Sequence, residues 1–236
     1  MKTVGDLAFH DCGVLSTVNF GDGLESIGKQ AFSYDRALTD VALPDSLRSI
    51  GDSAFEGCIG LTQINIPAHI SHLPEGVFYY CDRLAEVAFA EGLASLGARV
   101  FEGCVSLANV KLPDSVTQIG FRAFAGCAAL STIYVPSKTV VIDPSAFGET
   151  DDIAPLANPD LVLIGAPGSA VEAIAEQTGL AFDDISLWAD ESLLAYERNE
   201  DGMTITGYYG DADQVILPSY IGGLPVTTIG VDAFYD

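Results

Sequence analysis

The feature that most constrains this chain is a repeat of 23 residues. Seven phenylalanines follow one another at that constant step, and each is preceded by Ala or Val. Apolar columns keep the same phase six, nine, eleven and eighteen residues after each Phe. Columns in phase predict a solenoid, because every coil must present the same side chains to its neighbours. The phenylalanines are Phe9, Phe32, Phe55, Phe78, Phe101, Phe124 and Phe147.

Each repeat contains a short segment that alternates apolar and polar residues, as Gln63–Pro67 does, and such alternation predicts a strand. One strand that returns every 23 residues builds a parallel sheet. The stretch Ile50–Cys58 then predicts a turn, in which Gly supplies the special backbone angles and Ala54 and Phe55 enter the core.

The repeated unit I-G-x-x-A-F-x-x-C-x-x-L-x-x-V-x-L-P-x-S-L resembles the leucine-rich repeats of the BspA-like bacterial surface proteins. The resemblance covers residues 1–147 as six full repeats plus an entering and a leaving Ala-Phe. It implies an α/β solenoid, a right-handed leucine-rich-repeat superhelix with one short parallel strand per 23-residue coil. Asp35 stands where Cys is usual and Pro74 where Gly is usual. Both lie in turns, so we expect them to change local geometry only.

The regularity ends at Phe147, and the next residues predict a cap. Leu161–Ile164 predicts a strand, and Ser169–Glu172 is a capping box that opens a helix ending at Gly179. Leu180–Phe182 predicts a second strand. This strand–helix–strand order resembles the module that closes repeat arrays in the family, and a solenoid needs such a cap over its last apolar coil.

The end of the chain predicts a hairpin and the start of a second array. Two strand segments flank Asn199–Gly202, Val215–Ser219 repeats the strand pattern, and Ile229–Phe234 repeats the turn pattern. A short insertion is expected around Ile221–Val226.

The expected domains are therefore the repeat array at 1–147, the capping module at 148–185, and the hairpin with the beginning of a second array at 186–236. Because the chain starts and stops within coils, we expect it to be a piece of a longer protein whose export signal lies outside this segment.

The charge of the chain excludes several classes of partner. It carries 33 Asp+Glu against 10 Lys+Arg, a formal net charge of −23. Binding of nucleic acid or of an anionic membrane surface needs clustered basic residues, so neither is expected. No run of 18 apolar residues occurs, so no membrane insertion of this segment is expected. The acidity is uneven, because residues 148–236 hold 17 acidic residues and one basic residue.

The cysteines and histidines are the candidate metal ligands. All five cysteines lie three residues after a Phe, at Cys12, Cys58, Cys81, Cys104 and Cys127. They form either disulfides or a metal site, or they stack as small buried thiols. The lack of a CxxC pair and of a His column argues against a zinc site. Neighbouring coils are close enough for a disulfide, so this alternative stays open. The thiols are favoured because free Cys is among the most buried residue types. His10 is isolated. His69 and His72 would need a third ligand, such as Glu75 or Glu91, and are interpreted as residues of the coil surface.

Two further motifs suggest ion binding only weakly. Gly165–Ser169 precedes a helix but lacks the phosphate-loop Lys and the dinucleotide glycine spacing, so it is interpreted as a turn and cap. The acidic pairs of the C-terminal part lack the twelve-residue calcium-loop pattern. These pairs are Asp151-Asp152, Asp183-Asp184, Asp190-Glu191 and Asp211-x-Asp213. No metal site and no cofactor is predicted.

The outward positions of the predicted strands are the best candidates for binding, because solenoids commonly bind along their concave sheet. Their side chains are small and polar, with one aromatic residue near one end. The candidate residues are Thr17, Asn19, Asp40, Gln63, Asn65, Glu86, Asn109, Lys111, Thr132 and Tyr134.

Taken with the resemblance, these patterns predict a non-enzymatic binding or adhesion module of a bacterial cell-surface or secreted protein. Its expected partner is a host or bacterial surface protein or glycan, recognised through the concave sheet, and its expected location is extracellular. A structural spacer with no ligand of its own is the alternative. An enzyme is not predicted, because no recognisable catalytic motif occurs.

Overall fold

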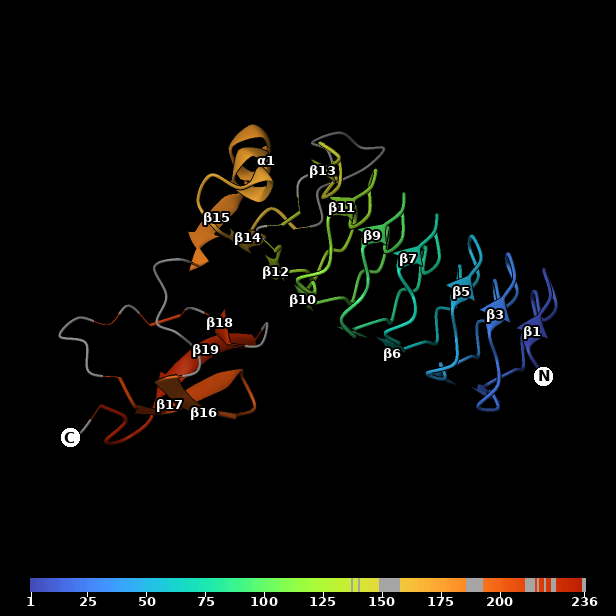
Figure 1. The fold of residues 1–236 in the computed structure, drawn as a ribbon, viewed down its shortest axis with the longest axis horizontal. Helices are drawn as coiled ribbons and strands as arrows, with labels where there is room; N and C mark the ends of the chain where they lie inside the picture. The colour runs from blue at the N-terminus through green and yellow to red at the C-terminus, as the bar shows by residue number, and fades with distance from the viewer. Residues whose placement is uncertain are drawn as a thin grey trace.

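The computed structural model describes residues 1–136, 138–139, 141–148, 158–185, 193–210, 215, 217–218, 220–221 and 224–234. Figure 1 shows the coils of a solenoid following one another from the N terminus to a helix, α1 (Ala170–Thr178), with the strands β16–β19 beyond it. The solenoid predicted from the 23-residue step is therefore confirmed. In the described part of the chain, no helix has the length and apolarity needed to cross a membrane.

Each coil contributes one longer strand to a parallel arrangement. Partners in neighbouring coils are 23 residues apart, as in Thr17↔Asp40, Gln63↔Glu86 and Asn109↔Thr132. The predicted strand per coil is therefore present in the predicted register. The expected parallel sheet is divided, however, because Asp40–Ala42 does not pair with Gln63–Ile66, and Glu86–Phe89 does not pair with Asn109–Lys111. The long strands are β2 (Thr17–Asn19), β4 (Asp40–Ala42), β6 (Gln63–Ile66), β8 (Glu86–Phe89), β10 (Asn109–Lys111) and β12 (Thr132–Tyr134).

The structure adds a second, two-residue strand in each coil. Each consists of one residue facing solvent and one apolar residue from the column eighteen positions after Phe. Two residues are too few for alternation to reveal a strand in the sequence. These short strands are β1 (Thr3–Val4), β3 (Ser26–Ile27), β5 (Ser49–Ile50), β7 (His72–Leu73), β9 (Ser95–Leu96), β11 (Gln118–Ile119) and β13 (Val141–Ile142).

The core of the array is a stack of phenylalanine rings. Successive ring centroids lie 5.1–5.9 Å apart, and successive rings are nearly parallel, within 17°. Six of the seven rings are fully buried, while Phe9 in the first coil is 38% exposed. Burial of a side chain this size contributes about 1.5–3 kcal/mol, so the column is a main source of stability.

The cysteines form a second buried column. Cys58, Cys81, Cys104 and Cys127 are buried free thiols, and each donates from Sγ to the carbonyl of the Phe 26 positions earlier at 3.1 Å. Burial raises the pKa of Cys58 to about 12 and raises the pKa values of the other three. The interpretation as stacked thiols is confirmed, and Cys12 in the first coil is partly exposed.

The two departures from the repeat unit have local consequences, as expected. Asp35 is fully buried, and its Oδ1 accepts the backbone N–H of Cys12 at 2.6 Å. Pro74 has no N–H, whereas Gly51 and Gly97 at the same position each donate to the preceding coil at 2.8 Å. The ladder of short strands is interrupted between β5 and β7, next to Pro74, and continues from β7 to β13.

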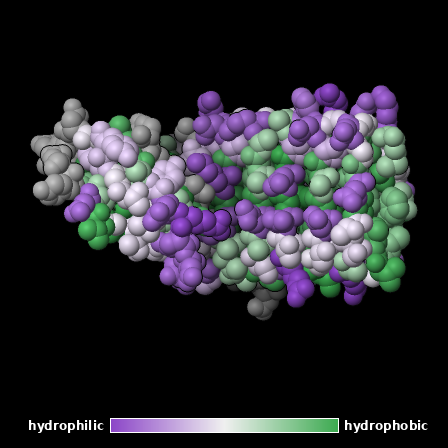
Figure 2. Space-filling view, turned by 90° about the horizontal axis from the view of Figure 1, so that it is seen from below, coloured by the Kyte–Doolittle hydropathy of each residue, from purple (hydrophilic) through white to green (hydrophobic). Residues whose placement is uncertain are grey.

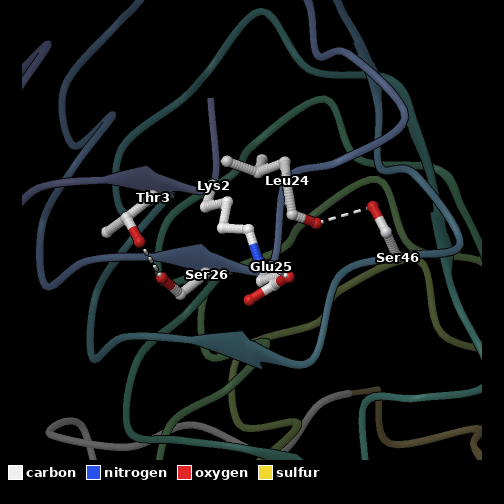
Figure 3. Close-up of polar contacts among 6 residues, drawn as sticks. All are labelled: Lys2, Thr3, Leu24, Glu25, Ser26 and Ser46. Atoms are coloured by element: carbon white, nitrogen blue, oxygen red, sulfur yellow. Dashed lines mark hydrogen bonds and ion pairs between the residues drawn. The ribbon is translucent and has the colours of Figure 1, made fainter.

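Polar side chains also connect one coil to the next. Figure 3 shows Ser26 donating to the Thr3 hydroxyl at 3.0 Å, and the Lys2 ammonium contacting the Glu25 carboxylate at 2.7 Å. Both pairs are 23 residues apart. It also shows Ser46 donating to the Leu24 carbonyl at 2.7 Å. The bond from Lys2 lowers the pKa of Glu25. Because the Lys2–Glu25 pair is exposed, it orders the coil surface more than it stabilises the fold.

The cap has the predicted strand–helix–strand order. β14 (Val162–Gly165) and β15 (Ala181–Asp184) extend the sheet of β10 and β12, so this sheet follows the order β10–β12–β14–β15. Helix α1 buries Val171, Ile174 and Ala175 and ends at Gly179, whose φ of 74° is the left-handed conformation of a helix C-cap.

The capping box forms only in part. Glu172 reaches back, but its Oε2 accepts the N–H of Gly168 at 2.6 Å, while Ser169 makes no side-chain cap bond. The carboxylate of Glu172 therefore takes a backbone donor before the helix, where an anion would otherwise bind. This supports the interpretation of Gly165–Ser169 as a turn and cap.

The predicted hairpin is present near the end of the chain. β16 (Leu194–Arg198) pairs antiparallel with β17 (Met203–Tyr208), and β17 pairs parallel with β19 (Leu224–Ile229). The expected insertion forms a small antiparallel pair of β18 (Tyr220–Ile221) with β19. Gly230 donates to the Ile205 carbonyl at 2.7 Å, as Gly51 donates to Ile27 in the array.

Parts of the sequence-based organisation are not settled by these strands. Ile216 and Ser219 of the segment Val215–Ser219 lie outside the described residues, and its other residues are not in a strand. The second array and the boundaries at 148 and 186 stay predictions.

Candidate binding site

The face formed by the long strands, here called the long-strand face, alternates buried and solvent-facing side chains. In β6 the apolar Ile64 and Ile66 are buried, while Gln63 and Asn65 are exposed. This alternation follows from the period of two in a strand. Figure 2 looks onto the molecule from below the view of Figure 1, and hydrophilic side chains are spread over the array with apolar surface between them.

The predicted binding residues lie on this face, with one difference from expectation. Asn109 and Tyr134 are half-buried, while Thr132 is 1% exposed. Thr132 is enclosed because β14 of the cap pairs with β12, and its hydroxyl donates to Asn109 Oδ1 at 2.8 Å. It therefore orients Asn109 and offers no surface to a partner. The exposed candidates are Thr17, Asn19, Asp40, Gln63, Asn65, Glu86 and Lys111.

The long-strand face is hollowed near its C-terminal end by a groove of about 800 Å³. Its floor comes from β8, β10 and β12, and four predicted residues line it, namely Glu86, Asn109, Lys111 and Tyr134. A volume of this size lies within the range of small-ligand sites, which is about 300–1,000 Å³. The structure thus gathers four of the candidates in one hollow. The other six do not line it.

Side chains in the groove contact one another across neighbouring coils. The Lys111 ammonium lies 5.8 Å from the ring centroid of Tyr134, and the Tyr134 hydroxyl donates to Asp114 Oδ1 at 3.3 Å. Asn109 Oδ1 accepts from the hydroxyls of Ser131 and Thr132. Within the described residues the amide N–H groups of Asn109 have no partner, so they remain available to a ligand.

Several groove residues were not predicted from the sequence. Glu91 and Asp114 lie in the turns after β8 and β10, two and three residues beyond the ends of these strands, where the alternation identifies no position. Ile185 is the last residue of the cap, and Arg198 and Leu224 come from the segments after it. One feature of the sequence could have drawn attention to Arg198, because it is the only basic residue among residues 148–236.

The other candidates have structural explanations. His72 contacts the Ser95 hydroxyl at 2.7 Å, and His10 contacts that of Ser33 at 2.6 Å. No group of three His, Cys, Asp or Glu residues that could hold a metal occurs among the described residues. Of the acidic pairs, only Asp183-Asp184 lies within them. A smaller hollow of about 320 Å³ lies by the short strands and includes His72 and Gln118.

Comparison with protein families gives a match over the array and the first part of the cap. Six copies of the BspA type leucine rich repeat region match this chain, over residues 2–131 and 73–162. No curated protein matches the chain.

Comparison with solved structures shows the same fold. A leucine-rich repeat protein from Eubacterium ventriosum is 31% identical with a TM-score of 0.57, over 60% of this chain and 39% of its own. One from Bacteroides ovatus is 24% identical with a TM-score of 0.56, over 70% of this chain and 46% of its own. The chain therefore spans less than half of the length of either protein.

Proposed function

The chain belongs to the family of BspA-type leucine-rich-repeat proteins, and from this premise we propose that it is a non-enzymatic binding module of a bacterial cell-surface protein. It recognises a surface protein or glycan through the long-strand face, at the groove near the C-terminal end of the array. The observation that carries this proposal is the groove itself. It brings Glu86, Asn109, Lys111 and Tyr134 together around a hollow of about 800 Å³.

The physical support is the mixture of groups that the groove offers. A binding site needs enclosed surface together with a few well-placed polar groups. Tyr134 and Phe89 supply ring surface, Asn109 supplies amide donors, and Lys111 supplies a charge. These groups stand on strands whose positions are set by the stacked core, so little backbone freedom is lost on binding.

A panel of immobilised glycans and purified extracellular-matrix proteins tests the proposal with the whole 236-residue chain. We expect the unmodified chain to bind at least one panel member. We expect a triple variant, Asn109→Ala with Lys111→Ala and Tyr134→Ala, to lose that binding. The matched control carries Gln118→Ala and Tyr80→Ala, an amide and an aromatic residue that do not line the groove.

The outcomes separate binding from a spacer function. Binding that survives the triple variant, or that falls equally in the control, would place recognition elsewhere. A chain that binds no panel member would favour the structural spacer and overturn the proposal. Far-UV circular dichroism of each variant shows that the fold is retained.

A further inference from the structure

The groove unites basic residues from two distant parts of a very acidic chain. The chain has a net charge of −23 and ten Lys+Arg residues. Lys111 comes from β10 of the array, and Arg198 comes from β16, after the cap. Residues 148–236 hold 17 acidic residues and this single arginine. Arg198 therefore lines the same hollow as Lys111, although the two residues come from distant parts of the chain.

In the described part of the chain, neither of these cations forms an ion pair with a carboxylate. Within the residues that the structure describes, the ion pairs are Lys2–Glu25 and Arg99–Glu102, and they involve neither Lys111 nor Arg198. Lys111 faces the Tyr134 ring at 5.8 Å, and Arg198 is exposed. An ammonium and a guanidinium without carboxylate partners, beside one hollow, are suited to an anionic group of a ligand.

The acidic residues of the groove limit how much negative charge that ligand can carry. Glu86, Glu91 and Asp114 line the same hollow. Together with Lys111 and Arg198 they give the lining a formal charge of −1. A polyanion would be repelled by the three carboxylates, whereas a ligand with an isolated carboxylate can meet the two cations. Hydroxyl groups elsewhere on the ligand can donate to the carboxylates.

A ligand that is rich in hydroxyl groups also fits the other side chains of the groove. Asn109 offers amide donors, and Tyr134 offers ring surface against which the C–H face of a sugar ring can pack. The groove volume of about 800 Å³ holds an oligosaccharide of a few units. A globular protein partner would need a contact of about 800 Å² on each side, which extends well beyond this hollow.

We propose that the groove binds a short saccharide bearing an isolated carboxylate, of the hexuronic-acid or sialic-acid kind, with Lys111 and Arg198 on the carboxylate and Tyr134 under a sugar ring. This inference rests on the proposed binding function and names its ligand class. Arg198 is then a binding residue contributed from beyond the array and cap.

Isothermal titration calorimetry of the whole chain tests this inference with four probes. They are glucuronosyl-xylotriose, which carries one carboxylate, 3′-sialyllactose, the neutral galactotriose, and an acidic hexapeptide of Glu and Gly. At about 0.15 M salt the Debye length is about 8 Å, so remote acidic residues are largely screened. The two acidic sugars distinguish hexuronate from sialate as the source of the carboxylate.

We expect at least one acidic sugar to bind about tenfold or more tightly than galactotriose, as a charge-assisted hydrogen bond implies. Arg198→Gln and Lys111→Gln should each remove most of this preference, and Arg198→Lys should restore part of it. Tyr134→Ala should weaken the acidic and neutral sugars alike. The matched control Arg48→Gln, an exposed arginine that does not line the groove, should change nothing.

Each contrary result has a definite meaning. Equal affinity for acidic and neutral sugars would refute recognition of a carboxylate, and it would leave glycan binding by the groove intact. Tighter binding of the hexapeptide than of any sugar would assign the groove to polypeptide. No binding of any sugar would overturn the inference, while the panel with matrix proteins would still decide the proposed function independently.

Discussion

Asp35 is a carboxyl group buried in the column where four other coils carry a buried cysteine. Its Oδ2 has no hydrogen-bond partner among the described residues, while Oδ1 accepts from Cys12. Burial raises the pKa of Asp35 from 3.8 to about 6. The hydrogen bond from the Cys12 N–H opposes this rise, the charge of Asp11 adds to it, and His10 opposes it. Asp35 is therefore a built-in source of pH-dependent instability.

The direction of the effect follows from where the proton binds more tightly. Because the pKa of Asp35 is higher in the folded chain than in the unfolded chain, protonation favours folding. The cost of the charged form is absent below pH 3.8 and fully present above pH 6. A rise of about two pKa units corresponds to about 3 kcal/mol. Asp35 is fully buried, but a single coil separates it from solvent on its N-terminal side. The nearby solvent raises the effective dielectric constant around the carboxylate, which reduces the expected cost to about 1–2 kcal/mol.

Replacing Asp35 by asparagine removes the charge and keeps an acceptor for Cys12. We expect Asp35→Asn to raise the free energy of unfolding by about 1–2 kcal/mol at pH 7, and to change it little at pH 3.5. Urea unfolding followed by far-UV circular dichroism measures both values, with Asp45→Asn, an exposed carboxyl group, as the control. An equal gain at both pH values, or a loss at pH 7, would refute the assignment of the penalty to the buried charge.

Three further predictions concern the repeated columns. Phe78→Ala leaves a cavity in the middle of the ring stack, and thermal unfolding should show a loss of about 3–5 kcal/mol. Gly103→Ala should cost more than Gly168→Ala in the same assay, because both have left-handed φ but only the Cβ at position 103 would strike the ring of Tyr80; equal losses would contradict this. A thiol reagent should modify Cys12 alone before unfolding, since burial suppresses the thiolates of the other four.

The sequence predicts the array well because the array is made of local, repeated contacts. The 23-residue columns determine which side chains stack, so the phenylalanine and cysteine columns and the register of the long strands could all be predicted. The short strands could not be, because two residues carry no detectable period. Ser169 also departs from its motif. The capping box predicts a hydrogen bond from a helical N–H to the Ser169 hydroxyl, but in the structure this bond is absent and Glu172 accepts the N–H of Gly168.

The groove could be predicted only in part, for a different reason. Glu86, Asn109, Lys111 and Tyr134 follow from alternation along the strands. Arg198 reaches the same hollow from β16, and no period links it to β10, which lies almost ninety residues earlier. Contacts between a repeat array and the segment beyond its cap depend on tertiary packing, which the columns do not encode.

Hydrogen exchange of the whole chain, measured by mass spectrometry with and without saturating acidic sugar, tests the central claim most directly. Binding in the groove should slow exchange in the peptides that contain residues 86–91, 109–114 and 132–134, and in the separate peptide that contains residues 194–198. Protection confined to other coils, or protection of the array peptides without residues 194–198, would contradict a site that is shared between the array and Arg198.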